Sequence, residues 1–324
     1  MAAYVVRRLF WSIPVLVALL LAVFLLMQAI PGGPFDFAGE RSLPEAVIAN
    51  LERRYGLDKP LHEQFANYLK SIVLEGDLGP SFRQRNRSVN DIIGDSFPIS
   101  AQLGILAIGL ALLIGIPAGI VAALNHNRLP DYVASFLAIL GVSIPALVLG
   151  PVLYWLFALK LGWLPVALWG AEKPFFLGFL PMPTAKFIRH AILPTVALGT
   201  GMSASIARLT RASLLQVIRE DYIRTARAKG LRERAVVVRH ALKNSLIPVV
   251  TVLGPMFAAV VTGTIVIESV FGIPGMGKYF VQGISNRDYP VIMGVTLIYA
   301  VILVLSNLLV DITYAWLDPR IRYS

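Results

Sequence analysis

DYIRTARAKGLRERAVVVRHALKN, residues 221–244, is a strongly basic stretch between two long apolar segments. The chain of 324 residues is otherwise 56% hydrophobic and only 15% charged, whereas a soluble protein carries about a quarter charged residues. This composition indicates a membrane protein. The net charge of +10 then reflects Lys and Arg held on one side of the bilayer rather than a nucleic-acid site.

Six apolar segments are long enough to cross a bilayer, which takes about 20 residues of helix. They are 9–30, 97–124, 132–159, 191–207 with an extension past Arg208 and Arg211, 244–267 and 289–310. Prolines predict kinks or wide turns inside them, at Pro14, Pro117, Pro145, Pro151, Pro194, Pro248 and Pro255. The first segment is predicted to stay as an anchor, because its core exceeds the roughly 7–15 apolar residues of a signal peptide. The predicted fold is all-α and membrane-embedded, with six transmembrane helices.

Basic residues set the expected orientation, because Lys and Arg accumulate in cytoplasmic loops. With six spans, both termini, the basic loop and a short turn all fall on one side, predicted to be the cytoplasm. Their basic residues are Arg7, Arg8, Arg128, Arg219, Arg224, Arg227, Lys229, Arg232, Arg234, Arg239, Lys243, Arg320 and Arg322. The chain is therefore expected to divide into an N-terminus with the first span (1–30), an extracytoplasmic segment (31–96), a membrane core (97–316) that includes the loop 219–245, and a cytoplasmic tail (317–324).

The extracytoplasmic segment is predicted to fold into two helices packed on the bundle. The first starts at a capping box, Ser42–Glu45, and stops at Gly56. The second begins at Pro60 and ends near Gly76. A later loop rich in Trp and Pro, 161–185, is predicted to be interfacial or re-entrant rather than a seventh span.

Patterns typical of catalysis are missing from the sequence. It has no cysteine and no G-x-x-x-x-G-K-[ST] phosphate loop. Its histidines show no metal-ligand spacing, at His62, His126, His190 and His240. The chain is therefore predicted not to be an enzyme and to hold no cofactor or metal. Glu268 and Asp311 lie near span ends, where a wet or paired structural role is expected, and the scarcity of mid-membrane carboxylates weakens the case for an ion-coupled transporter.

Within the basic stretch, residues 221–228 are predicted to form a short helix with acidic residues at the positive end of its dipole. Gly230 is expected to adopt the left-handed conformation and to turn the chain into a second helical stretch, 232–242. The small side chains of Ala226 and Ala228 would let another protein approach the backbone. On this pattern alone, a loop that only touches anionic lipid is the more common case.

The stretch YIRTARAKG (222–230) resembles the EAA loop of ABC importer permeases, in the form found in their oligopeptide and dipeptide branch. The general pattern is E-A-A-x-x-x-G, followed by a hydrophobic-Leu-Pro exit. Arg224 stands at the Glu position, Thr225 and Ala226 at the two Ala positions, and Gly230 at the Gly. Arg224, Thr225 and, at the exit proline, Lys243 depart from the general pattern.

Three further stretches extend the resemblance over nearly the whole chain. YGLDKPLHEQFANYLKSIVLEGDLGPSF (55–82) resembles the external segment of this branch, and ESVFGIPGMGKYFVQGISNRDYP (268–290) resembles its segment between the last two spans. The ending LDPRIR (317–322) is similar to its short cytoplasmic tail.

This resemblance implies a type I ABC importer permease in a bacterial or archaeal inner membrane. Such permeases pair with a related second permease, two cytoplasmic ATPases that bind ATP and Mg, and an external solute-binding protein, and no nucleic acid is involved. The short helix would dock in a groove on an ATPase and carry its motion to the spans. The residues implied in this coupling are Arg224, Thr225, Ala226, Arg227, Ala228, Lys229, Gly230 and Arg232. Di- or oligopeptides, nickel chelates and oligosaccharides all remain open as substrates.

Small polar residues of the third to fifth spans are candidates for the transport pathway, although they also make ordinary helix–helix contacts. They are Ser143, Ser203, Ser205, Thr262 and Thr264. Two other classes of protein remain as alternatives. One is a secondary transporter or channel that works without ATPases, whose distinguishing features, an internal repeat with broken half-helices and buried carboxylates, are not evident in the sequence. The other is a membrane scaffold whose basic loop binds lipid or a soluble partner.

Overall fold

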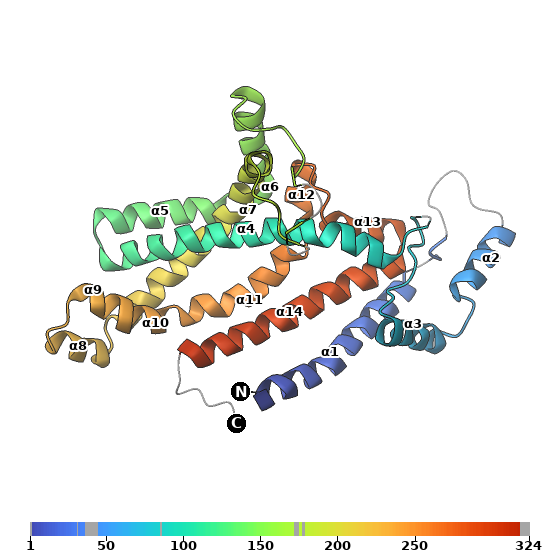
Figure 1. The fold of residues 1–324 in the computed structure, drawn as a ribbon, viewed down its shortest axis with the longest axis horizontal. Coiled ribbons are helices and arrows are strands. Elements are labelled where there is room, and N and C mark those ends of the chain that lie inside the picture. Colours follow the sequence, from blue (N-terminus) through green and yellow to red (C-terminus); the bar gives the residue numbers. More distant parts are fainter. Residues whose placement is uncertain are drawn as a thin grey trace.

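The computed structural model describes residues 2–30, 32–35, 45–84, 86–171, 175–176 and 179–317. These residues form a bundle of long helices that lie side by side along one axis (Figure 1). Extended pairing in the described part of the chain is confined to two isolated bridges. The prediction of an all-α membrane fold is therefore confirmed.

Among the described residues, five helices are long and apolar enough to cross a membrane, and a bent helix pair makes a sixth span if it is counted as one. The long helices are α1 (Ala2–Gln28), α4 (Val89–Leu124), α7 (Ala185–Val217), α11 (Ile247–Val261) and α14 (Tyr289–Leu317). α4, α7 and α14 cover their predicted spans, and α1 ends two residues before the predicted end of the first. The span predicted at 244–267 is formed by α11 together with α12 (Ile265–Val270), after a break between them. The fourth span, α7, extends past Arg208 and Arg211, as expected.

The third predicted span is two helices rather than one rod. α5 (Leu129–Ser143) and α6 (Ala146–Leu153), which continues as the π-helix η1 (Tyr154–Lys160), meet at 96°. Pro145 disfavours helical geometry at the preceding residue, and Ile144 is extended, with φ −90° and ψ 110°. The kink expected from this proline is thus a sharp corner.

α4 is the central helix of the bundle and makes its most extensive contact with α7. Gly115 and Gly119 allow the two backbones to lie close together, because they have no side chain. A Cβ at either position would lie only 2.6 Å from a carbonyl oxygen of α7. Small residues let membrane helices approach in this way. α4 starts eight residues before the predicted span, because Ser88 and Asp91 form a capping box at its N-terminus.

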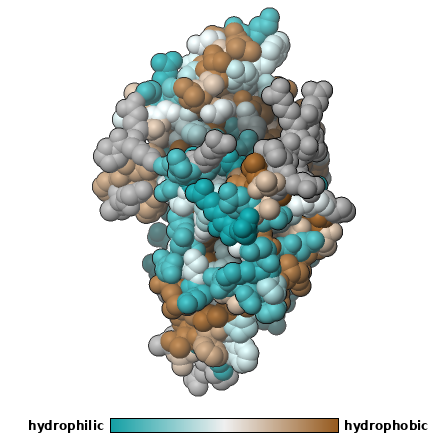
Figure 2. Space-filling view, turned by 90° about the vertical axis from the view of Figure 1, so that its right-hand side faces the viewer, coloured by the Kyte–Doolittle hydropathy of each residue, from teal (hydrophilic) through white to brown (hydrophobic). Residues whose placement is uncertain are grey.

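The two helices predicted to be extracytoplasmic lie at the opposite end of the molecule from the basic loop (Figure 1). α2 (Glu45–Tyr55) and α3 (Leu61–Glu75) end at the left-handed glycines Gly56 and Gly76, as predicted. Residues 42–44 of the expected capping box lie outside the described residues. Hydrophilic residues gather in the middle of this end of the molecule, as Figure 2 shows.

Two short helices, α12 (Ile265–Val270) and α13 (Gly277–Asn286), lie between α11 and α14 in the chain. We call the end of the bundle near α2, α3 and α13 the outer end, and the end that carries α8 (Asp221–Ala228) the inner end. The described part of the 161–185 loop packs beside these two short helices, because Leu168 donates a backbone hydrogen bond to Phe271 and the Trp169 indole donates to Gln102 of α4. No helix is formed between η1 and α7 in the residues described, which agrees with a loop rather than a seventh span.

Candidate functional site

The basic loop forms a short helix with two different faces. α8 runs from Asp221 to Ala228 and starts at the acidic pair predicted for its N-terminus. Ile223 and Ala226 are buried, whereas the remaining residues of the helix are exposed. One face of α8 therefore rests on its own chain, and the other is open to a partner.

The buried face packs into an apolar cluster that we call the α8 seat. The seat consists of Ala123 from α4, Leu214 from α7, Ile223 and Ala226 from α8, and Val236 and Ala241 from η2. Ile223 and Leu214 have no exposed surface. Because α4 and α7 both contribute, α8 is in contact with the ends of two membrane helices.

Gly230 turns the chain back toward the membrane, as the sequence predicts. It is left-handed, with φ +75°, and its N–H donates to the carbonyl of Arg227 at 2.9 Å. The return passes through α9 (Glu233–Ala235), the π-helix η2 (Val236–Ala241) and α10 (Leu242–Ser245). π-helical runs are rare and are frequently found at functional sites.

Charged side chains on the exposed face are partly paired within the loop. The Arg227 guanidinium donates two hydrogen bonds to the Glu233 carboxylate, at 2.7 and 3.1 Å. These bonds lower the pKa of Glu233 and raise that of Arg227. Arg224 donates to Asp221 at 3.2 Å, one turn earlier. The pair Arg227–Glu233 links α8 to α9 across the Gly230 turn.

Another ion pair at the same end of the bundle was not predicted from the sequence. Arg211 of α7 donates to both oxygens of Asp131 at 2.5 and 2.7 Å, which ties α7 to the start of α5. His126 is also 3.2 Å from this carboxylate, which is 2% exposed. Asp131 and Arg211 are 80 residues apart, so no local pattern joins them. The part of the chain that the structure describes holds no group of three or more His, Cys, Asp or Glu side chains suited to a metal ion.

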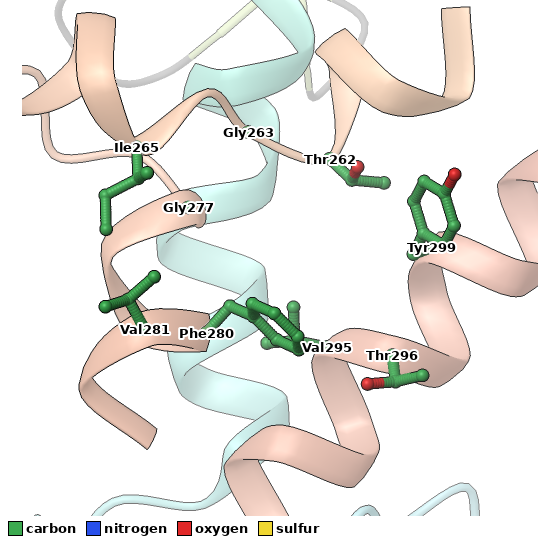
Figure 3. A pocket seen from close by; sticks show the side chains of 9 residues that line it. All are labelled: Thr262, Gly263, Ile265, Gly277, Phe280, Val281, Val295, Thr296 and Tyr299. Carbon is green, nitrogen blue, oxygen red and sulfur yellow. The ribbon is translucent and has the colours of Figure 1, made fainter. Parts of the chain in front are cut away.

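Toward the outer end, a break between α11 and α12 opens beside a cavity of about 280 Å³. Thr262 and Gly263 line it from the break, Phe280 from α13, and Thr296 and Tyr299 from α14 (Figure 3). Its lining is almost entirely apolar. Such a cavity suits an uncharged group.

Comparison with known proteins identifies the family. A family profile described as "Binding-protein-dependent transport system inner membrane component" matches residues 115–323, and the N-terminal profile of the same component matches residues 1–104. The chain belongs to this family.

Similar permeases cover essentially the whole chain. The dipeptide transport system permease protein DppB of Bacillus subtilis (strain 168) is 47% identical over 99% of this chain and 98% of its own length. The oligopeptide transport system permease protein OppB of Escherichia coli (strain K12) is 43% identical, with both chains covered completely. The resemblance to the oligopeptide and dipeptide branch is thus confirmed.

A solved structure supports the permease fold. The MetNI methionine ABC transporter, in inward-facing conformations, aligns with a TM-score of 0.50 at 16% identity, and the alignment covers 68% of this chain and 96% of that one. At this identity the likeness concerns the fold alone.

The coupling residues expected in this permease occupy different surfaces. Most are exposed on α8 or the turn after it: Arg224, Thr225, Arg227, Ala228, Lys229, Gly230 and Arg232. Ala226 lies instead in the α8 seat and is 6% exposed. Its small side chain allows close packing on this chain itself, which differs from the expected approach of another protein at this residue.

The pathway candidates are not gathered at one place in the permease. Three hydroxyls donate to carbonyls of their own helices, those of Ser203, Ser205 and Thr262. Ser143 is exposed beside the α5–α6 corner, and the Thr264 hydroxyl is buried without a hydrogen-bond partner. Of the set, only Thr262 lines the cavity of Figure 3.

The two carboxylates noted near span ends have different settings. Asp311 accepts a hydrogen bond from the Tyr4 hydroxyl and pairs with Arg8, as expected for a paired residue. Glu268 lies on α12 and is 1% exposed, with the Ser100 hydroxyl 2.6 Å from one oxygen. The sequence does not reveal this burial, because the partner residue is 168 positions away.

Proposed function

We propose that this permease is the transmembrane subunit of an ATP-driven importer for di- or oligopeptides. The proposal rests chiefly on the α8 seat, which places a partly exposed helix on the ends of two membrane helices. The names of its relatives, a dipeptide and an oligopeptide permease, support the substrate class.

The proposed topology places both termini and the loop 219–245 in the cytoplasm. α8 lies at one end of the molecule, and α2, α3 and α13 lie at the other (Figure 1). The start of α1 and the end of α14 are the ends of those helices that point away from α13. Residues 31–96 would then be extracytoplasmic, between the first span (1–30) and the membrane core (97–316). The tail 317–324 would return to the cytoplasm of a bacterial or archaeal cell.

The proposed assembly contains a homologous second permease, two cytoplasmic ATPases and an extracytoplasmic solute-binding protein. The family description names binding-protein dependence. ATP and Mg would be bound by the ATPases, since this sequence has no phosphate-binding loop. Apolar side chains such as Leu113 and Leu137 are 74% and 60% exposed, which fits contact with lipid or the second permease.

In this mechanism α8 is a lever between the ATPases and the bundle. The exposed residues Arg224, Thr225, Ala228, Lys229 and Arg232 would face an ATPase, whereas Ile223 and Ala226 would pass its displacement to α4 and α7. ATP can shift the permease between inward- and outward-facing states only if the ATPases contact α8 differently in the two states. The Gly230 turn and the Arg227–Glu233 pair would keep the lever in one shape.

For the pathway, Thr262 is the best supported of the predicted residues because it lines the cavity beside the α11–α12 break. Thr264 has a buried hydroxyl at the same break. The lining residues that the structure describes carry no charged side chain, so the cavity would not select peptides by the charge of their side chains. Ser143, Ser203 and Ser205 remain candidates with weaker support.

Purification of the tagged permease from its own membranes, with identification of co-purifying proteins and an ATPase assay, tests this function. We expect a second permease and phosphate-loop ATPases. The substitution Gly230→Asp should leave membrane insertion intact and uncouple ATP hydrolysis from uptake, because Asp is strained at φ +75°. Unchanged ATP-dependent peptide uptake by this variant would contradict the coupling role of the loop.

A further inference from the structure

The Glu268 carboxylate forms a buried bridge between α4 and the outer helices. The Ser100 hydroxyl of α4 donates to Oε1 at 2.6 Å, and the N–H of Gly277 at the start of α13 donates to Oε2 at 2.9 Å. Ser100 in turn accepts a hydrogen bond from the N–H of Met276 at 2.7 Å. One carboxylate and one hydroxyl thus join α4, α12 and α13.

Three glycines fit closely around this carboxylate. An ideal Cβ at Gly275 would lie 2.6 Å from Oε2, and one at Gly263 or Gly277 would lie 3.0 Å from a carboxylate oxygen. Contacts below 3.0 Å force a shift, and contacts of 3.0–3.4 Å are unusually tight. The carboxylate therefore has little freedom to move, and the outer helices are held in one position relative to Ser100.

On its other side, the outer segment has no continuous helical connection. α11 ends at Val261, Gly263 has φ +113° and Thr264 is extended. Gly272, between α12 and α13, is also left-handed, at φ +61°. The cavity of about 280 Å³ lies next to this break. The segment 265–286 therefore has a flexible connection toward α11 and another between α12 and α13. It is hydrogen-bonded to α4 and also packs on α6 and α14.

α4 connects this contact with the basic loop. The helix is unbroken for 36 residues, from Val89 to Leu124, a length of about 54 Å at 1.5 Å per residue. Ser100 lies in its outer part, and Ala123 lies in the α8 seat at its inner end. One helix thus carries both the lever contact and the Glu268 contact.

We propose that Glu268 is a positioning residue that fixes the outer segment α12–α13 to α4, so that this segment moves with α4 when α8 is displaced. This inference rests on the proposed function, in which ATPases displace α8. Glu268 does not touch the cargo in this role. Its hydrogen bonds make the segment α12–α13 follow the movement of α4.

The movement can be tested by distance measurement in the assembled transporter. The chain has no cysteine, so Leu113→Cys on α4 and Ser285→Cys on α13, both exposed, give a unique label pair once the partner subunits are cysteine-free. We expect the same mean distance with and without ATP. In the Glu268→Ala background we expect a broader distribution whose mean shifts on ATP addition. An ATP-driven shift in the parent as large as in Glu268→Ala overturns the proposal.

The transport assay uses the ratio of peptide imported to ATP hydrolysed, which a loss of folded protein alone does not change. Glu268→Ala should lower this ratio by about fivefold or more, the lower range of coupling between distant sites. Glu268→Gln keeps the volume but sets an amide N–H₂ against donors, so its loss should be smaller. An unchanged ratio in Glu268→Ala, with less folded transporter, would show a structural role only and overturn the proposal.

Asp311→Asn is the matched control for these variants. It removes a carboxylate charge from a contact between α14 and α1, away from α4, and should leave the ratio at the parent value. Gly230→Asp is measured in parallel. If Gly230→Asp leaves ATP-driven uptake intact, the proposed function itself fails. If it uncouples while the Glu268 variants keep the parent ratio and label distance, only the present inference is overturned.

Discussion

The two ends of this permease hold their short helices by opposite means. At the inner end, α8 rests on apolar side chains and turns its charges outward. At the outer end, α12 and α13 are held by a buried carboxylate that lies among glycines and a serine hydroxyl. An apolar contact tolerates sliding because it is non-directional, whereas directional hydrogen bonds to a buried carboxyl group fix one geometry. The inner contact suits a moving lever, and the outer one suits a fixed joint.

The largest expected effect concerns a polar contact at the inner end, which is an exception to the apolar packing of α8 there. Arg211→Met removes the guanidinium that donates to both oxygens of the buried Asp131 carboxylate and should cost about 3–5 kcal/mol, as expected when one partner of a buried ion pair is lost. Thermal unfolding in detergent would measure the loss. Arg208→Met, an exposed neighbour on the same helix, should change little. Equal losses in both variants would mean that the α5–α7 pair does not stabilise this end.

Next in size is the apolar seat itself. Ile223 has no exposed surface, so Ile223→Ala should cost about 2–5 kcal/mol through lost burial and a cavity. Because the seat joins α8 to α4 and α7, ATP-dependent uptake should fall more than ATP hydrolysis. Leu231→Ala, in the same loop but 42% exposed, is the control. Wild-type coupling in Ile223→Ala would argue against the seat as the lever contact.

A smaller effect is expected when a side chain is added to one of the three glycines that surround the Glu268 carboxyl group. Gly275→Ala places a Cβ against the Glu268 carboxyl group, and overpacking of this kind costs about 1–3 kcal/mol. Gly109→Ala on α4 meets nothing within 4 Å and should be neutral or slightly stabilising. Thermal unfolding of the two variants gives the comparison. If Gly275→Ala is as stable as Gly109→Ala, the glycines do not hold the Glu268 carboxyl group rigidly.

The smallest effect is the pH dependence of the Arg227–Glu233 pair. The pKa of Glu233 is lowered in the folded state, so the pair stabilises the loop above the ordinary pKa of 4.5, and this contribution is lost as the pH falls through the folded pKa. Both side chains are more than one-third exposed, so the contribution should be about 0.3 kcal/mol. Glu233→Gln should differ from the parent in thermal unfolding at pH 7 and match it at low pH. A difference that persists at low pH would point to packing instead.

Local signals in the sequence predicted much of this fold. Hydropathy located the spans, and glycines predicted the ends of α2, α3 and α8, because both depend on neighbouring residues. Pro145 predicted a kink, but its size, 96°, depends on how α5 and α6 pack on the bundle.

The missed features all depend on residues distant in sequence. Glu268 was expected near a wet or paired end, and its burial follows from Ser100 and the glycines around it. The Asp131–Arg211 pair likewise forms across 80 residues. The exposed coupling residues could be proposed from a short motif. The burial of Ala226 could not, because it depends on where α4 and α7 lie.

The corner between α5 and α6 has a consequence for how the chain is inserted during synthesis. α5 has 15 residues, about 22 Å of helix, which is shorter than the roughly 30 Å of the hydrocarbon core. The backbone at the corner also leaves helical hydrogen bonds unmade, and lipid cannot replace them. Gly141 near the corner packs against Thr200 and Ala204 of α7. We therefore expect α5 and α6 to insert stably only after the translocon has delivered α7. In chains truncated before residue 185, glycosylation mapping should find α5 and α6 in a mixture of topologies.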